Sequence, residues 1–338
     1  MSENHNEDFF KSKATTFGTF DPARDDYLHP DLVHPADTST ETQYFGFYVP
    51  EANIYGFSYF WLKPNMKSIM GGVLVAQGSK RHHLQCELID FHQNVHYDTA
   101  IKDDLRSYTL PNSYGVDVLE PGQRMRLRYD NPTLQNRIDL DITAAGPVAM
   151  RANNKHFEQA MRYQGELVLR GKRYAVDCCN VRDRSWGEPR PEVTLDFPPL
   201  TWTTGCFGPD FAFNCSAFDH PDFNPPSLKD FPISAEKAFN DGWIWRNGEL
   251  VKIKSIRKLT QRDPVTARPL SHDMHAVDVN GREYRITGTV TAALPFSFWP
   301  NCVTHLCMTK WECEGLIGWG DTQEVQWSKY IRRFTQMG

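Results

Sequence analysis

Residues 242–260, GWIWRNGELVKIKSIRKLT, carry the clearest fold signal in the chain. Apolar and polar residues alternate on both sides of Asn247–Gly248, and an Asn-Gly pair between alternating segments is the strongest short-range indication of a β-hairpin. Residues 274–294 repeat this arrangement around Asn280–Gly281. Both stretches therefore predict antiparallel hairpins in the C-terminal half of the chain.

Strand-like segments of the same kind occur from residue 44 onward. They are short runs of β-branched and aromatic residues bounded by Gly, Pro, Asn and Asp, at residues 44–50, 54–64, 71–78, 84–98, 125–130, 137–146, 163–177, 200–208, 211–219, 305–315 and 323–333. They do not alternate with helical patterns, which argues against a parallel α/β fold. We therefore expect an all-β protein of two antiparallel β-barrel domains packed side by side, with few short helices.

The length of 338 residues also favours two domains, because single cores seldom grow beyond about 250–300 residues. We predict an extended N-terminal arm at residues 1–43, an N-terminal β-barrel at 44–155, and a C-terminal β-barrel at 156–338 with a long Pro-rich loop at 220–240. The segment PVAMRANNKHFEQAM, residues 147–161, is the best helical or irregular candidate between the halves.

Charge and composition exclude several classes of protein. The net charge is −5, and no basic cluster exceeds the short run from Lys252 to Lys258, so we expect no nucleic-acid partner. No stretch approaches the roughly 18 apolar residues of a membrane span. Residues 1–13 lack an apolar signal-peptide core, which predicts a cytoplasmic location. The eight cysteines do not show the spacing of a zinc site or a disulfide framework, so we interpret them as buried thiols.

The sequence NVRDRSWGEP, residues 180–189, is too polar for a plain core strand and too aromatic for a plain loop. On a strand, Asp183 and Ser185 would share one face, and Arg182, Arg184 and Trp186 would share the other. Asp183 has two interpretations: an ionised structural anchor beside the arginines, or a general acid in an apolar barrel mouth.

Residues 156–187 resemble a segment of the lipocalin-like proteins in the carotenoid 1,2-hydratase and AttH-like superfamily. In that segment a strand ends in Asp, a basic residue, a variable residue, an aromatic or other residue, and Gly, which here are Asp183, Arg184, Ser185, Trp186 and Gly187. Uncharacterised two-domain bacterial members with an Arg-Asp-His-Ser-Trp-Gly signature are the most similar; Arg184 stands in place of their His. The hydratases have a Tyr where this chain has Val181.

The resemblance implies two lipocalin-like barrels with an apolar pocket. It also implies activities such as the addition of water to isoprenoid double bonds or, in related fungal proteins, pericyclic cyclisation. Protonation of an alkene requires an acid in a dry site and π faces that stabilise the resulting cation. Asp183 together with Trp186 would meet both requirements.

The segment IDFHQNVHYD, residues 89–98, places ligand-type side chains two residues apart. On a strand, Asp90, His92, Asn94, His96 and Asp98 would share one face. A metal would need a further ligand from elsewhere, so we predict no metal site. We assign His92 and His96 to polar substrate contacts, with a solvated sheet face as the alternative.

Aromatic residues at alternating positions are candidates for a ligand wall, although such residues more often belong to a core. The candidates are Tyr59, Trp61, Trp202 and Trp243, with Asn214 as a polar contact. No Gly-rich phosphate loop and no Gly-x-Ser-x-Gly elbow occurs in a suitable context, so no cofactor is expected.

Together these features predict a cofactor-independent enzyme, a lyase or an isomerase/cyclase, acting on an apolar isoprenoid, steroid or polycyclic molecule by acid/base-assisted hydration or dehydration, isomerisation or cyclisation. The predicted catalytic residues are Asp183, Arg182 and Arg184. Two alternatives stay open: a non-catalytic carrier of hydrophobic metabolites, and a pericyclic cyclase that works by shape. The sequence leaves both a monomer and a homodimer open.

Overall fold

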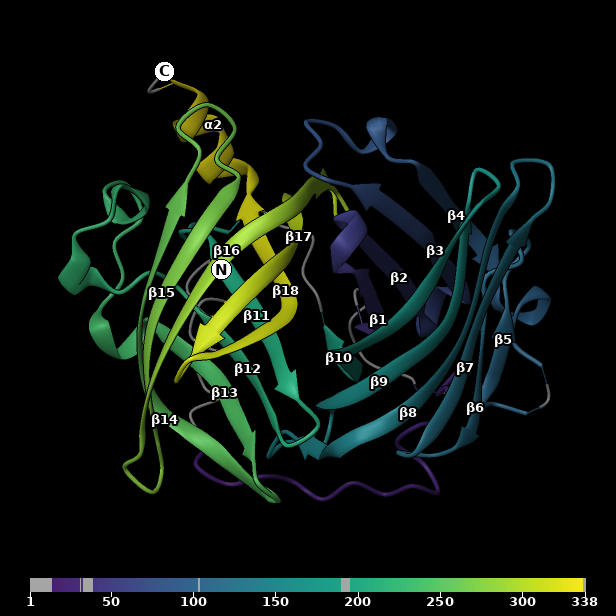
Figure 1. Cartoon of the computed structure of the whole chain (residues 1–338), viewed down its shortest axis with the longest axis horizontal. Helices are drawn as coiled ribbons and strands as arrows, with labels where there is room; N and C mark the ends of the chain where they lie inside the picture. Colours follow the sequence, from purple (N-terminus) through teal and green to yellow (C-terminus); the bar gives the residue numbers. More distant parts are fainter. Residues whose placement is uncertain (1–13, 31, 33–38, 103, 190–194, 337–338) are drawn as a thin grey trace. The chain divides into compact units, whose positions relative to one another are not determined.

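The computed structural model describes residues 14–30, 32, 39–102, 104–189 and 195–336, which divide into two compact units (Figure 1). Of these residues, 18–78 and 83–189 form the N-terminal unit, and 14–17, 79–82 and 195–336 form the C-terminal unit. Across the described ranges, no helix is both long and apolar enough to cross a membrane.

The N-terminal unit contains a ten-stranded antiparallel sheet that curves into a half-barrel. Its spatial order is β4-β3-β2-β1-β10-β9-β8-β7-β6-β5. The strands are β1 (Ser39–Val49), β2 (Ile54–Lys63), β3 (Ser68–Gln77), β4 (Leu88–His96), β5 (Ser107–Thr109), β6 (Gly115–Glu120), β7 (Arg124–Asn131), β8 (Asn136–Met150), β9 (His156–Leu169) and β10 (Lys172–Pro189).

The C-terminal unit contains a closed eight-stranded barrel, in which each strand pairs with the next and β18 returns to β11. Its strands, green to yellow in Figure 1, are β11 (Leu200–Gly208), β12 (Phe211–Ala217), β13 (Phe239–Arg246), β14 (Glu249–Arg262), β15 (Pro269–Asp278), β16 (Glu283–Phe296), β17 (Cys302–Cys313) and β18 (Leu316–Trp327). The prediction of an all-β fold with two lipocalin-like domains is confirmed, although the first domain is a half-barrel.

Helices play a minor part in the described residues. Helix α2 (Ser328–Gln336) follows the last strand. Short 3₁₀ turns connect strands at η1 (Pro50–Ala52), η2 (Pro64–Met66), η3 (His83–Gln85) and η4 (Tyr97–Thr99), and the predicted Pro-rich loop contains η5 (Pro221–Phe223), η6 (Pro226–Leu228) and η7 (Ala235–Lys237).

Both predicted Asn-Gly hairpins are present. In the first, Arg246 pairs with Glu249, so Asn247 and Gly248 form a two-residue turn between β13 and β14. Both turn residues have positive φ, 50° and 85°, as a type I′ turn requires, and this turn matches the twist of the flanking strands. The second hairpin joins β15 to β16 through a longer loop that contains Gly281 at φ 85°.

The segment at residues 147–161 is neither a helix nor a boundary between sheets. It contains the end of β8, a turn with Asn154 at φ 53°, and the start of β9. Strands β9 and β10 belong to the N-terminal sheet, because β10 pairs with both β9 and β1. The sheets therefore divide after Pro189, whereas the sequence suggests a division at residue 155.

The predicted N-terminal arm also differs from the structure where residues are described. Strand β1 begins at Ser39 and is buried along its whole length. Farther upstream, Asp25, Asp26 and Leu28 are buried in the N-terminal unit. Residues 1–13, 31 and 33–38 of the predicted arm lie outside the described residues.

Alternation along β1 and β2 produces two buried faces in the N-terminal sheet. One face carries Phe45, Phe47, Phe60 and Leu62 into the main hydrophobic core. The other face carries the aromatic residues between them in sequence, which are also buried, namely Tyr44, Tyr48, Tyr55, Phe57, Tyr59 and Trp61. We call this second side the aromatic face of the sheet, and it includes Asp183.

Candidate functional site

Arg182 forms a buried ion pair with the segment that precedes β1. Its Nη1 lies 2.7 Å from Asp26 Oδ1, and its Nη2 donates to Gln159 Oε1 at 2.8 Å. Burial by itself would raise the pKa of Asp26, but the Arg182 guanidinium outweighs burial and holds that pKa below its usual value. Arg182 therefore anchors the N-terminal segment.

Arg184 makes equivalent contacts two residues farther along β10. Its guanidinium contacts the Glu41 carboxylate, and its Nε donates to the carbonyl oxygen of Asp25 at 3.0 Å. Both arginines project from the face of β10 opposite Asp183. The predicted role of Arg182 and Arg184 beside the Asp183 carboxylate is therefore corrected to a structural one.

Trp186 packs on the same side as the arginines. It is 3% exposed and clusters with Met150 and Phe157. Its ring stacks on His29 with centroids 5.2 Å apart. Because successive side chains of a strand point to opposite faces, Trp186 does not share a face with Asp183, and the predicted pairing of these two residues does not form.

Asp183 lies on the aromatic face and is half-buried. Strand register places it directly opposite Tyr44 of β1 on one side and Glu158 of β9 on the other. Glu158 is 1% exposed, and its Oε1 lies 3.0 Å from Arg151 Nη2 and 2.7 Å from His156 Nε2. Asp183 therefore lies between Tyr44 and Glu158, and the Glu158 carboxylate already contacts Arg151 and His156.

Tyr59 and Trp61 extend the same face. Tyr59 is the register partner of Tyr44, and Trp61 is the partner of Thr42. Thr42 Oγ1 in turn lies 2.7 Å from Ser185 Oγ. Tyr59 and Trp61 are 8% and 7% exposed. One row across three strands therefore joins Tyr59 to Asp183, and Trp61 stands in the adjacent row on the same face.

His92 and His96 do not form the predicted comb of ligands. The alternation of β4 breaks at Asn94, where φ is 57° and the register with β3 shifts. His92 pairs with Gly71 and His96 with Ser68, so the two rings project to opposite faces. Their side chains are 43% and 53% exposed, and the described part of the chain contains no group of three His, Cys, Asp or Glu arranged to hold a metal.

The remaining predicted contacts belong to the C-terminal barrel; Asn214 and Trp243 point to the side of their strands opposite the core residues Phe213 and Ile244. Trp202 is half-buried between register partners Ser216 and Gln323. Asn214 and Trp243 are direct register partners and are each 1% exposed. Asn214 Nδ2 and Trp243 Nε1 find no hydrogen-bond partner among the described residues, so both donors could serve a polar ligand atom.

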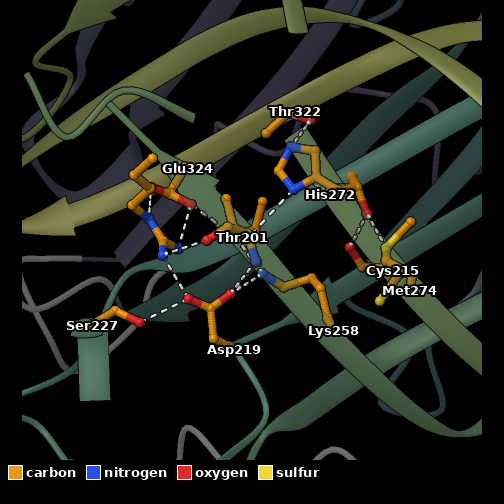
Figure 2. A network of polar contacts seen from close by, with 12 residues as sticks. Thr201, Cys215, Asp219, Ser227, Lys258, His272, Met274, Thr322 and Glu324 are labelled. Atoms are coloured by element: carbon orange, nitrogen blue, oxygen red, sulfur yellow. Dashed lines mark hydrogen bonds and ion pairs between the residues drawn. The ribbon is translucent and has the colours of Figure 1, made fainter. Parts of the chain in front are cut away.

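A network of polar side chains occupies part of the barrel interior (Figure 2). Lys258 Nζ lies 2.9 Å from Asp219 Oδ1 and donates to Thr201 and Thr260 at 3.0 and 2.7 Å. Arg262 lies 2.6 Å from Asp219 Oδ2 and holds Glu324 through two bonds of 2.8 Å. Two cations thus balance two carboxylates, and all three donors of Lys258 Nζ are used.

His272 extends the network as a neutral ring. Its Nδ1 lies 3.2 Å from Thr260 Oγ1 and its Nε2 lies 3.1 Å from Thr322 Oγ1, so one nitrogen donates and the other accepts. Burial first, and then the charge of Lys258, lower the pKa of His272 to about 3. No donor of Lys258 and no nitrogen of His272 is left for a substrate, so these residues brace the barrel, and we call them the scaffold network.

The low pKa of His272 predicts a loss of stability in mild acid. The folded protein keeps the ring neutral, whereas the unfolded chain binds a proton near pH 6.5. The free energy of unfolding should therefore fall as the pH drops below about 6.5, and by about 2 kcal/mol at pH 5 from this ring alone. Burial also lowers the pKa of His305, to about 4. This ring therefore lowers the free energy of unfolding in acid as well.

Urea denaturation at about pH 7.5 and about pH 5 measures this effect. A His272→Gln variant should show about half of the wild-type difference, because His305 still contributes. Equal stability of the wild-type protein at both pH values would contradict the neutral buried ring.

Sequence patterns alone do not reveal the scaffold network or the partners of the arginines. Lys258 stands in sequence within a short basic run. The only indication of its role is its place on the strand. Lys258 and Arg262 share the face of β14 that carries the buried residue Ile256. Asp26 and Glu41 carry no comparable signal, because they pair with residues more than 140 positions away.

A closed eight-stranded barrel and a ten-stranded half-barrel sheet in one chain define a two-domain lipocalin-like protein. The chain belongs to the family described as "Domain of unknown function (DUF7064)", whose model matches residues 22–329. No curated protein matches the chain.

Solved structures share the fold at low sequence identity. The chain is similar to a protein described as "a putative AttH (NE1406)" from Nitrosomonas europaea, with a TM-score of 0.61, 13% identity, and coverage of 91% of this chain and 96% of that one. It is also similar to CghA, with a TM-score of 0.57, 11% identity, and coverage of 94% and 96%. Kievitone hydratase from Nectria haematococca aligns at a TM-score of 0.49 with 11% identity over 95% and 98%, a likeness too weak to carry an argument.

Proposed function

We propose that the protein is a cofactor-independent enzyme that transfers a proton to or from an apolar small molecule, with Asp183 as the general acid/base. The single observation that supports this proposal most is the register of β10, β1 and β2. In that register Asp183, Tyr44 and Tyr59 stand in one row on the aromatic face. A proton donor beside π faces is what an alkene or alcohol substrate needs when a cation develops on carbon.

The neighbours of Asp183 have separate roles in this proposal. Glu158 contacts Arg151 and His156, whereas Asp183 stands in the row with Tyr44 and Tyr59, so Asp183 is the group proposed to exchange the proton. Tyr59 and Trp61 form the apolar wall. Hydration, dehydration, isomerisation and cyclisation of an isoprenoid, steroid or polycyclic molecule all fit this arrangement, since each begins with a proton transfer in a dry site.

Trp202, Asn214 and Trp243 belong to the C-terminal unit and are not part of the proposed site at Asp183. The buried donors of Asn214 and Trp243 suit a carbonyl or hydroxyl oxygen of a ligand bound to the C-terminal unit itself. His92 and His96, which are largely exposed and point apart, are not part of this proposal.

Native mass spectrometry of the freshly purified protein, followed by extraction of anything bound, tests the proposal. We expect a bound apolar compound that wild-type protein converts to a product with a molecule of water added or lost, or to an isomer. A compound that returns unchanged from an excess of protein would instead support the alternative of a non-catalytic carrier.

A further inference from the structure

A cavity of about 540 Å³ lies in the C-terminal unit. Its lining comes from residues 79–81, from the loop at 263–268 between β14 and β15, from the neighbouring ends of β16, β17 and β18, and from α2. Figure 1 shows α2 at the end of the barrel where β14 and β15 join. The volume falls within the range of about 300–1,000 Å³ that is usual for small-molecule sites.

The polar part of the lining has an excess of positive charge. Lys80, Arg81 and Arg268 contribute cations, and Asp263 is the one carboxylate in the lining. Arg268 Nη1 donates to Ser79 Oγ at 3.0 Å, and hydrogen bonds from backbone amides, together with the charge of Arg268, lower the pKa of Asp263. Asp263 is already engaged, because its Oδ1 accepts from two backbone amides at 2.9 Å. The cavity therefore favours an anion.

His305 lines the cavity and has an unused hydrogen-bonding atom. The residue is 5% exposed, and its Nδ1 has no hydrogen-bond partner among the described residues. Its neighbour Gln326 is fixed, since Nε2 donates to Ala267 O and to Glu324 Oε1, both at 2.8 Å. A buried polar atom without a partner is costly, and a carboxylate oxygen in the cavity would accept a hydrogen bond from Nδ1 in the tautomer that carries the proton there.

The rest of the lining is apolar. Pro295, Val303, Ile331 and Phe334 line the cavity together with the charged groups. Ile331 and Phe334 belong to α2, three residues apart, and therefore lie on one side of that helix. A ligand that fills this cavity has a hydrocarbon body as well as a negative charge.

We propose that this cavity binds an amphipathic monocarboxylate, with the carboxylate on Arg268 and His305 and the hydrocarbon body against α2 and β17. A carboxylate is the anion of choice here because guanidinium groups bind it in a planar geometry. The lining belongs entirely to the C-terminal unit, and Asp183 belongs to the other unit. Binding at this cavity can therefore be tested independently of the proposed enzymatic activity.

Calorimetric titration of the full chain with decanoate tests the site, with 1-decanol as the uncharged probe and acetate as the anion without a hydrocarbon body. We expect saturable binding of decanoate, weaker binding of 1-decanol, and none of acetate. Arg268→Gln should weaken decanoate binding by about tenfold or more and leave 1-decanol binding unchanged. Arg285→Gln, an exposed arginine of β16, is the matched control and should bind decanoate like the wild type.

A second variant keeps the test independent of Arg268. His305→Phe fills the same space without a polar atom and should also weaken decanoate binding while the thermal midpoint is retained. Equal decanoate affinity in the wild type and Arg268→Gln, equal binding of decanoate and 1-decanol to the wild type, or no saturable binding of decanoate would each overturn the proposal.

Discussion

Replacement of Lys258 by methionine is expected to lower the free energy of unfolding by about 3–5 kcal/mol, the range for a buried ion pair that loses one partner. Lys258 and Asp219 are 0% and 1% exposed. Without the lysine, Asp219 Oδ1 keeps only the amide of Thr260, at 2.9 Å, as a donor, and Thr201 and Thr260 lose their shared cation. Arg262 alone then faces two carboxylates.

Chemical denaturation measures this loss, and the strand itself supplies the control. Lys254 lies on β14 as well, but its side chain is exposed, so Lys254→Met should change stability by no more than about 0.5 kcal/mol. The double variant Lys258→Met/Asp219→Asn should be less unstable than the two single effects added, because neither partner is left as an uncompensated charge. A Lys258→Met variant as stable as the Lys254→Met control would refute the scaffold assignment.

Asp183→Asn is expected to lower kcat/KM for the identified substrate by about 10²–10⁴-fold, the usual contribution of a positioned acid or base. Asparagine has nearly the same shape as aspartate but carries no exchangeable acid proton. The ion pairs of Arg182 and Arg184 lie on the other face of β10, so the variant should keep its stability.

Two further variants distinguish proton transfer by Asp183 from a general charge effect and from catalysis by shape. Asp177→Asn removes an exposed carboxylate from the same strand, one that pairs with Arg162 at the surface, and should leave turnover unchanged. Trp61→Leu removes an aromatic wall without touching an acid. If Trp61→Leu were more damaging than Asp183→Asn, the pericyclic alternative would replace the acid/base mechanism.

Local patterns in the sequence were sufficient for the strands. Alternation and the Asn247–Gly248 turn depend on neighbours within a few residues, and the same alternation correctly placed Asp183 on the face opposite Arg182 and Arg184. The helical interpretation of residues 147–161 was wrong because Met150 and Phe157 are buried by pairing of β8 with β9 across a turn, and not on one face of a helix.

Features that depend on distant residues could not be predicted in this way. The pairing of β10 with β1 joins Asp183 to Tyr44 across almost 140 residues, and without it the row to Tyr59 is invisible. Likewise, the two arginines that flank Asp183 in sequence suggested an electrostatic cluster around that residue. Arg182 and Arg184 instead pair with Asp26 and Glu41, which lie far upstream in the chain.

Proton transfer by Asp183 is tested most directly by incubation of the extracted compound with protein in D₂O; where that compound loses water, its product is incubated instead, so that the hydration direction is followed. Mass spectrometry should show a product with one deuterium bound to carbon, formed at similar rates by the wild type and Asp177→Asn and about 10²–10⁴-fold more slowly by Asp183→Asn. A hydrate or isomer that forms without deuterium in the wild type, or deuterated product that Asp183→Asn forms at the wild-type rate, would contradict proton transfer by Asp183.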